Sequence, residues 1–140
     1  MRPIRLTSAL VALGALAATF AIRSAPASAH HSFAAEFDGS KPITLKGIVM
    51  QIDWTNPHVW FYINVKDEDG KAMRWAFEMG APHQLQQRGW LRDTMKVGDV
   101  VTVAGSLARD GSKRANARTV TTADGKTLGA ASSGDSTTRQ

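Results

Sequence analysis

Two stretches with an apolar residue at every second position flank a turn sequence at 67–70, and this pattern constrains the fold more than any other feature. A period of two is typical of a β-strand with one buried face, and a turn that ends in Asp-Gly is typical of a β-hairpin. The apolar positions are Val59, Phe61, Ile63 and Val65 before the turn, and Met73, Trp75, Phe77 and Met79 after it. The middle of the chain is therefore predicted to be a hairpin, which excludes an all-helical domain.

The segment at 43–54 precedes this hairpin and is predicted to be a long strand whose apolar phase changes. Ile43 and Leu45 share one parity, and after Gly47 the apolar positions fall on the other parity. These later positions are Ile48, Met50, Ile52 and Trp54. A strand whose inward face switches at a glycine is typical of a β-bulge or a sharp coil. We therefore expect an irregularity at Gly47 and the later apolar residues, including Met50, in the core.

The rest of the chain adds one helix and further strands. Pro82 suits the first turn of a short helix at 83–88, which ends at Gly89. Apolar runs that predict strands follow at 100–105, 106–108 and 115–121, with a last short run at 127–128. The order β-β-β-α-β-β predicts a mainly β fold, a small five-stranded OB-like Greek-key barrel with one short helix between strands three and four. A small open sheet or a sandwich is the alternative.

The N-terminal segment, residues 1–29, differs from the rest in charge and hydropathy. It holds three arginines and no acidic residue, its stretch at 6–22 is almost entirely apolar, and it ends in Ala-Ser-Ala. A basic start, an apolar stretch and a small-residue cleavage sequence are typical of a secretory signal peptide. We expect cleavage after Ala29 and a periplasmic location, without a stable membrane anchor; a retained anchor is the alternative.

Removal of this segment changes what the charge implies. The whole chain has 17 Lys+Arg and 12 Asp+Glu, a formal charge of +5 and a pI near 10.0. Without the three leading arginines, 14 basic residues face the same 12 acids, which leaves +2. A charge this small does not favour a nucleic-acid partner. The chain also has no cysteine, which excludes disulfides and thiolate metal sites.

The sequence divides into four segments by composition. Residues 1–29 are the predicted signal peptide, and 30–41 form an N-terminal arm without sustained periodicity. Residues 42–128 are the predicted OB-like β domain. Residues 129–140 are small and polar, which predicts a disordered tail.

Four histidines are candidate metal ligands: His30, His31, His58 and His83. Cleavage after Ala29 makes His30 the N-terminus, so its α-amine and its imidazole can chelate one ion together, and His31 adds a second imidazole. Sites rich in nitrogen suit Cu(II) first, then Ni(II) or Zn(II). His58 lies in the connection between the first two predicted strands, and His83 starts the short helix as a weaker candidate. The alternative is a solvated chain end that binds no metal.

The same connection carries a second candidate surface. Its members are aromatic or conformationally restricted side chains that suit recognition of a peptide, a glycan or a partner protein: Trp54, Asn56, Pro57, Trp60 and Tyr62. OB folds use the loop between strands one and two for ligands. The alternative for Trp54 is core packing, because it ends an apolar stripe.

Catalytic patterns are weak in this sequence. Ser32 lies beside a histidine, but no carboxylate stands in an orienting position for a triad. Glu78 lies on the outward parity of its strand, where a solvated position is the default and Arg74 or His58 is a candidate neighbour. We therefore expect a periplasmic protein that binds a small ligand and is not an enzyme.

Several short sequences occur together in this chain: HHSF at 30–33, WTNPH at 54–58, FEMG at 77–80, RGW at 88–90 and KVGDVVTV at 96–103. In this combination the chain resembles a family of small exported bacterial proteins, mostly proteobacterial, of unknown function. The resemblance covers about residues 30–128. It implies a periplasmic destination and a single β domain, and it brings no established activity, cofactor or catalytic residue.

Overall fold

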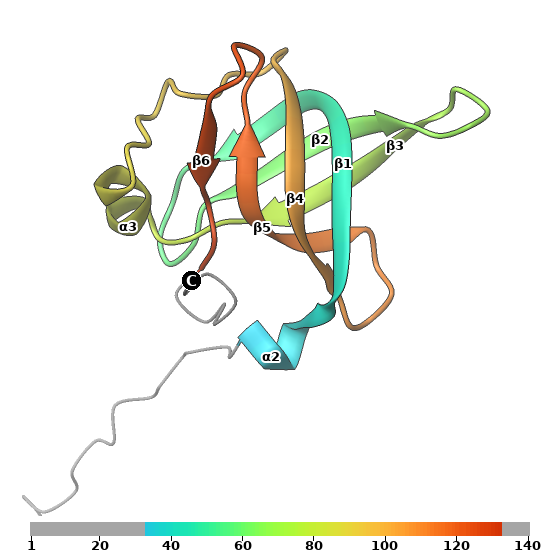
Figure 1. The fold of residues 1–140 in the computed structure, drawn as a ribbon, viewed down its shortest axis with the longest axis horizontal. Coiled ribbons are helices and arrows are strands. Elements are labelled where there is room, and N and C mark those ends of the chain that lie inside the picture. The colour runs from blue at the N-terminus through green and yellow to red at the C-terminus, as the bar shows by residue number, and fades with distance from the viewer. Residues whose placement is uncertain (1–32, 133–140) are drawn as a thin grey trace, which may run out of the picture. The chain divides into compact units, whose positions relative to one another are not determined.

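The computed structural model describes residues 33–132, which form six strands and two short helices (Figure 1). The elements in chain order are α2 (Phe33–Glu36), β1 (Phe37–Asp53), β2 (Trp60–Lys66), β3 (Ala72–Glu78), α3 (Pro82–Gln87), β4 (Val100–Ala108), β5 (Arg114–Thr121) and β6 (Thr127–Gly129). The predicted signal peptide lies outside the described residues. In the described part of the chain, no helix is long and apolar enough to cross a membrane.

The strands form one sheet in the order β3-β2-β1-β4-β5-β6, and each of these neighbouring pairs is antiparallel. A further parallel pairing joins β3 to β5 through Ala76 with Arg114, Phe77 with Ala115, and Glu78 with Asn116. This pairing brings the sheet back onto itself as a barrel (Figure 1). The mainly β, OB-like fold is therefore confirmed. The sheet has six strands, not five, because the run after the last turn pairs with β5 as the short strand β6.

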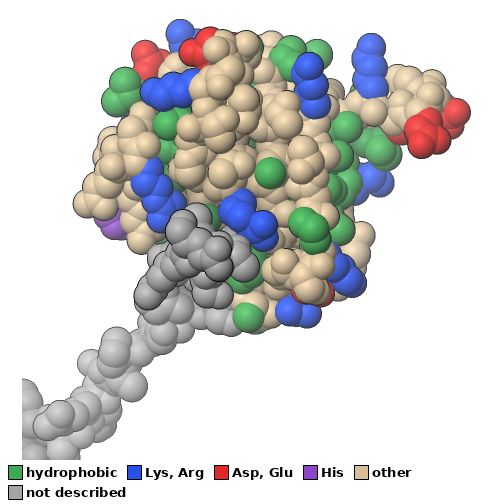
Figure 2. Space-filling view, in the orientation of Figure 1, with side chains coloured by type: hydrophobic (Ala, Val, Ile, Leu, Met, Phe, Trp, Pro, Cys, Tyr) green, Lys and Arg blue, Asp and Glu red, His purple; other side chains and the backbone are tan. Residues whose placement is uncertain are grey.

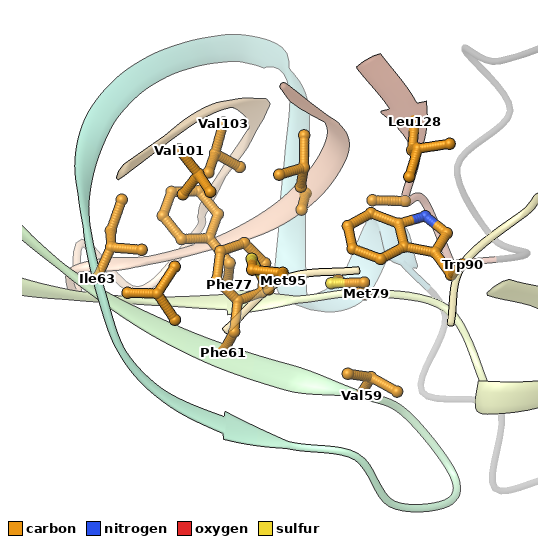
Figure 3. Close-up of a cluster of buried hydrophobic side chains, with 14 of the residues drawn as sticks. Val59, Phe61, Ile63, Phe77, Met79, Trp90, Met95, Val101, Val103 and Leu128 are labelled. Carbon is orange, nitrogen blue, oxygen red and sulfur yellow. The ribbon is translucent and has the colours of Figure 1, made fainter. Parts of the chain in front are cut away.

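The barrel interior is apolar. The alternation of apolar residues in the sequence predicts which side chains of β2 and β3 face this interior. Phe61 and Phe77 are paired across these strands and stack with ring centroids 5.3 Å apart (Figure 3). The helix α3 adds the buried Leu85, and the loop after it adds Trp90, whose Nε1 donates to the Gly129 carbonyl at 2.9 Å. Side chains from β2, β3, β4 and β5 and from this helix-loop region thus pack into one core.

The sequence predicted the wrong inward-facing residues in the middle of β1. Val49 is fully buried, whereas Ile48 and Met50 are each 44% exposed. The register irregularity lies between Val49 and Gln51 rather than at Gly47. Gly47 has a different role, because a Cβ there would lie 2.5 Å from the Asn64 carbonyl oxygen on β2. The glycine allows close approach of two strands without changing the phase of β1.

The ends of the β domain lie outside the limits that the sequence predicted. β1 begins at Phe37, which pairs with Ala108, so residues 37–41 of the predicted arm belong to the strand. At the other end, Ala130 is buried, receives a hydrogen bond from the Gly80 amide and donates its own amide to the Arg118 carbonyl. The first residues of the predicted tail therefore pack on the barrel. The sequence did not indicate that residues 37–41 belong to the strand, because the register between β1 and β4 is irregular there and the residues show no apolar period.

Candidate functional site

His58 occupies the connection between β1 and β2, close to the end of β3. The peptide bond between Asn56 and Pro57 is cis. Directly after His58, the Val59 amide donates to the Gly80 carbonyl at 3.2 Å, and the Val59 carbonyl accepts from the Met79 amide at 2.8 Å. These two bonds extend the β2–β3 ladder and fix the backbone at His58 beside the end of β3.

Glu78 is the last residue of β3, and His58 contacts its carboxyl group. Nδ1 of His58 and Oε1 of Glu78 are 2.7 Å apart. The Glu78 side chain is only 8% exposed, whereas the His58 side chain is 31% exposed. The imidazole therefore lies between a buried carboxyl group and the surface.

The surroundings of Glu78 disfavour its charge. Burial raises the pKa of this carboxyl group to about 7, and the nearby Glu36 carboxylate contributes to the rise, whereas Arg114 lowers it. A carboxyl group with a pKa near 7 changes its charge close to neutral pH. When Glu78 is ionised it accepts a hydrogen bond from Nδ1–H of His58, which leaves the imidazole lone pair on Nε2.

A second buried polar residue neighbours Glu78 on β5. Asn116 is paired with Glu78 in the parallel register, is 1% exposed and donates from Nδ2 to Oγ of Ser132 at 3.0 Å. Its Oδ1 is buried and has no hydrogen-bond partner in the structure that covers residues 33–132. Together, His58, Glu78, Asn116 and Ser132 are called the closure cluster here, because they lie where β3 meets β5.

The helix α2 is held next to this cluster by one arginine. Arg109, just after β4, donates its amide to the Glu36 carbonyl at 2.9 Å and its Nε to the Ala34 carbonyl at 2.8 Å. It also pairs with Asp38 at 3.5 Å. Hydrogen bonds from Ser40, with a smaller effect of Arg109, hold the pKa of Asp38 below its usual value. Arg109 thus ties α2 to the end of β4, and the Glu36 carboxylate lies within electrostatic range of Glu78.

The other three candidate metal ligands do not join His58 in the described structure. His30 and His31 lie outside the described residues. His83 is exposed on α3. Within residues 33–132, no group of three or more His, Cys, Asp or Glu side chains is arranged to hold a metal ion. The metal site therefore stays a prediction.

The candidate surface around the β1–β2 connection is partly exposed. Trp54 is half-buried against the core, while Asn56 and Pro57 are exposed. Trp60 and Tyr62 are half-buried on β2. The Arg74 guanidinium lies over the Tyr62 ring, 4.4 Å from its centroid. The space-filling view in Figure 2 shows one face of the molecule, on which charged and apolar side chains are interspersed.

Three members of the closure cluster, Glu78, Asn116 and Ser132, were not found as site residues from the sequence, and Ser132 falls in the predicted tail. Glu78 has the outward parity of β3, which predicts solvent, yet the structure buries it against His58. The only signal was its proximity to His58 across the predicted hairpin. Asn116 gave no signal, because its burial depends on the parallel β3–β5 pairing between segments far apart in the sequence.

The fold and the cluster define a small OB-like β-barrel protein with a buried polar group of side chains at the barrel closure. The chain belongs to a family of unknown function, DUF6152, whose family model matches residues 18–117. This finding confirms the resemblance to a family without an established activity. A search of curated proteins gave no match.

Among solved structures, the chain is similar to the mitochondrial single-stranded DNA binding protein Rim1 from S. cerevisiae. The TM-score is 0.47 and the sequence identity is 10%. The match covers 59% of this chain and 93% of that chain.

Proposed function

We propose that this chain is exported to the periplasm and, after cleavage following Ala29, binds a transition metal ion, copper first. The amine and imidazole of His30, the imidazole of His31 and Nε2 of His58 are the proposed ligands. His83 is a weaker candidate for a further ligand. The protein acts as a small-ligand-binding protein and not as an enzyme.

The observation that carries this proposal is the His58–Glu78 contact of 2.7 Å. Histidines that bind metal ions almost always donate their other ring N–H to a carboxylate, a carbonyl or water, which fixes the tautomer and raises the basicity of the ligand. Glu78 is a buried carboxyl group in contact with Nδ1, so Nε2 is the nitrogen suited to the metal.

The position of α2 supports a contribution from the new N-terminus. The described chain begins at Phe33, whose ring packs against Phe37 with centroids 5.8 Å apart. Glu36, in the same helix, is close enough to Glu78 to affect its pKa. His31 precedes Phe33 by two residues, and two residues span at most about 7 Å. The N-terminal histidines therefore precede a helix whose Glu36 lies within electrostatic range of the closure cluster.

The test uses protein matured by export from the full precursor, so that the N-terminus is His30. Bound copper, nickel and zinc are measured after purification, and the metal-free protein is titrated with Cu(II). We expect close to one Cu(II) per chain. A matched protein with one extra residue before His30 should bind more weakly, because its terminal amine is no longer part of the His30 chelate.

Single variants separate the histidines. His58→Ala should weaken Cu(II) binding, whereas His83→Ala should have a smaller effect and serves as the matched surface control. Failure of the matured protein to bind Cu(II) near stoichiometry would contradict the proposal. Equal affinity of the matured and the extended proteins would remove the terminal amine from the ligand set.

A second candidate function is a metal-free interaction module at the β1–β2 connection. Exposure of Asn56 and Pro57 beside the half-buried Trp60 favours it. The ligand would be a peptide, a glycan or a periplasmic protein. In this case Trp60→Ala would abolish binding of the partner while the copper content of the matured protein stays unchanged.

A further inference from the structure

The outward faces of β1, β2 and β3 carry a second group of side chains, which shares no residue with the closure cluster. We call it the Arg74 face and define it by Ile48, Met50, Gln51, Tyr62 and Arg74. The strand registers place Gln51 opposite Tyr62, and Asn64 between Ile48 and Arg74. These three strands are consecutive neighbours in the sheet (Figure 1).

Arg74 is held in place without an acidic partner. Its guanidinium lies 4.4 Å from the Tyr62 ring centroid, and its NH2 group donates to Oε1 of Gln51 at 2.7 Å. Gln51 in turn donates from Nε2 to the Asp53 carboxylate at 2.9 and 3.0 Å. No carboxylate among residues 33–132 forms an ion pair with Arg74. A pre-positioned guanidinium of this kind is suited to bind an incoming carboxylate.

Apolar side chains lie on the same face. Ile48 and Met50 are each 44% exposed. The irregularity of β1 between Val49 and Gln51 lets Met50 and Gln51 both lie outward. Ile48 is two strands away from Arg74, which corresponds to roughly 10 Å. Exposed aliphatic side chains beside Arg and Tyr match the composition of protein interfaces, in which Arg, Tyr and Met are enriched.

The charges of the Arg74 face and the exposure of the Tyr62 ring indicate which kind of ligand this face can bind. A sugar ring would stack on an open aromatic face, but Arg74 already covers one face of Tyr62. A nucleic-acid backbone would place phosphates near the Asp53 carboxylate, which repels them. A ligand with a carboxylate beside an aliphatic side chain fits this face, because Arg74 can pair with the carboxylate and Ile48 and Met50 can contact the aliphatic side chain.

We propose that the Arg74 face binds a peptide segment of a partner protein in which Asp or Glu lies close to an aliphatic residue. The acidic side chain pairs with Arg74, and the aliphatic side chain packs on Ile48 and Met50. This site is separate from the proposed metal ligands, so it binds its partner with or without metal.

The test selects ligands from a displayed library of random dodecapeptides, using the metal-free protein in the presence of a chelator. We expect enriched peptides that combine an acidic and an aliphatic residue. Affinities of the enriched peptides are then measured for Arg74→Gln and Met50→Ser. Each substitution should weaken binding about tenfold or more, as for other central interface residues.

Matched controls use exposed residues outside the Arg74 face. Arg92→Gln removes an exposed arginine and Leu91→Ser an exposed apolar side chain, and both variants should bind the peptides like the wild type. Circular dichroism confirms that each variant is folded.

Three outcomes would overturn the proposal. The first is that no peptide is enriched above a selection without protein. The second is that the enriched peptides lack acidic residues or bind Arg74→Gln as tightly as the wild type. The third is that oligothymidylate displaces the peptides, which would assign the face to single-stranded nucleic acid. Loss of copper binding by the matured protein leaves these outcomes unaffected, so the two proposals fail separately.

Discussion

The barrel interior and the closure cluster are both buried, but they are buried in different ways. Phe61 and Phe77 have inward parity and are enclosed by the barrel itself. Glu78 and Asn116 are paired in the register at the β3–β5 closure, and Asn116 bonds to Ser132 at the end of the described chain. The first region is apolar, and the second holds a carboxyl group, an imidazole and an amide.

The apolar core and the closure cluster differ in what their burial costs. An apolar core gains free energy simply from removal of its surface from water. A buried polar group costs free energy unless it finds a partner, and groups kept at such a cost are often functional. The closure cluster retains an acid near its point of ionisation beside a half-exposed histidine. We therefore infer that the core maintains the fold, whereas the closure cluster is the region on which the proposed metal binding rests.

The largest effect is expected in the core. Phe77→Ala removes a ring that is fully buried and stacked on Phe61. Loss of the buried surface and the cavity that remains should lower the free energy of unfolding by about 3–5 kcal/mol. Urea denaturation followed by tryptophan fluorescence measures it. A loss smaller than that caused by any closure-cluster substitution would contradict the division between the two regions.

The sequence predicted the first region far better than the second. In β2, inward parity and burial coincide, so alternation identifies its core residues; in β3 the inward Phe77 is buried as predicted, but the outward Glu78 is buried as well. In β1, parity failed at Val49 and Met50, because Gly47 serves a close strand approach rather than a phase change. The alternation of apolar residues within one strand does not predict which strand, distant in the sequence, will lie beside a given residue.

The closure cluster depends on such distant pairing. The parallel register brings Asn116 next to Glu78, and Ser132 accepts a hydrogen bond from Asn116. His58 was found from the sequence because histidine in a turn between strands is itself a signal. Its partner Glu78 was missed as a site residue because outward parity predicts solvent.

A smaller loss of stability is expected from Asn116→Ala. This substitution removes the hydrogen bond to Ser132 and leaves a buried hydroxyl group without its donor. The expected decrease in the free energy of unfolding is about 1–3 kcal/mol. The same urea denaturation measures it, with Gln87→Ala, an exposed position in α3, as a control. An unchanged midpoint would show that the cluster does not depend on this contact.

The next prediction concerns the pH dependence of stability in the metal-free protein. The pKa of Glu78 is raised from 4.5 to about 7 in the folded state. Between these values the folded state holds a proton that the unfolded state has lost, so stability decreases as the pH rises through this range. Below 4.5 both states are protonated, and the full contribution is present.

Glu78→Gln removes this titration. The variant should lose less stability than the wild type when urea denaturation is compared below pH 4.5 and above pH 7. Identical pH dependence in the two proteins would contradict a raised pKa for Glu78. In the same variant, Cu(II) affinity should fall by about tenfold or more, because an ionised carboxylate no longer supports the His58 ligand.

The smallest effect on stability is expected at Met50, in contrast with its neighbour Val49. Met50→Ala changes a half-exposed side chain and should alter the free energy of unfolding by no more than about 0.5 kcal/mol. Val49→Ala opens a fully buried position and should cost clearly more. Thermal unfolding of both variants checks the order, and a reversed order would restore the inward face that the sequence predicted for β1.

The most direct test of the metal proposal is pulsed electron paramagnetic resonance of the matured protein with one equivalent of Cu(II), in the wild type and in His58→Ala. Nitrogen modulation counts the imidazoles bound to the copper. We expect the wild type to show the His58 imidazole together with those of the N-terminal histidines, and His58→Ala to have one imidazole fewer. The same nitrogen pattern in both proteins would contradict the role that we assign to the His58–Glu78 pair.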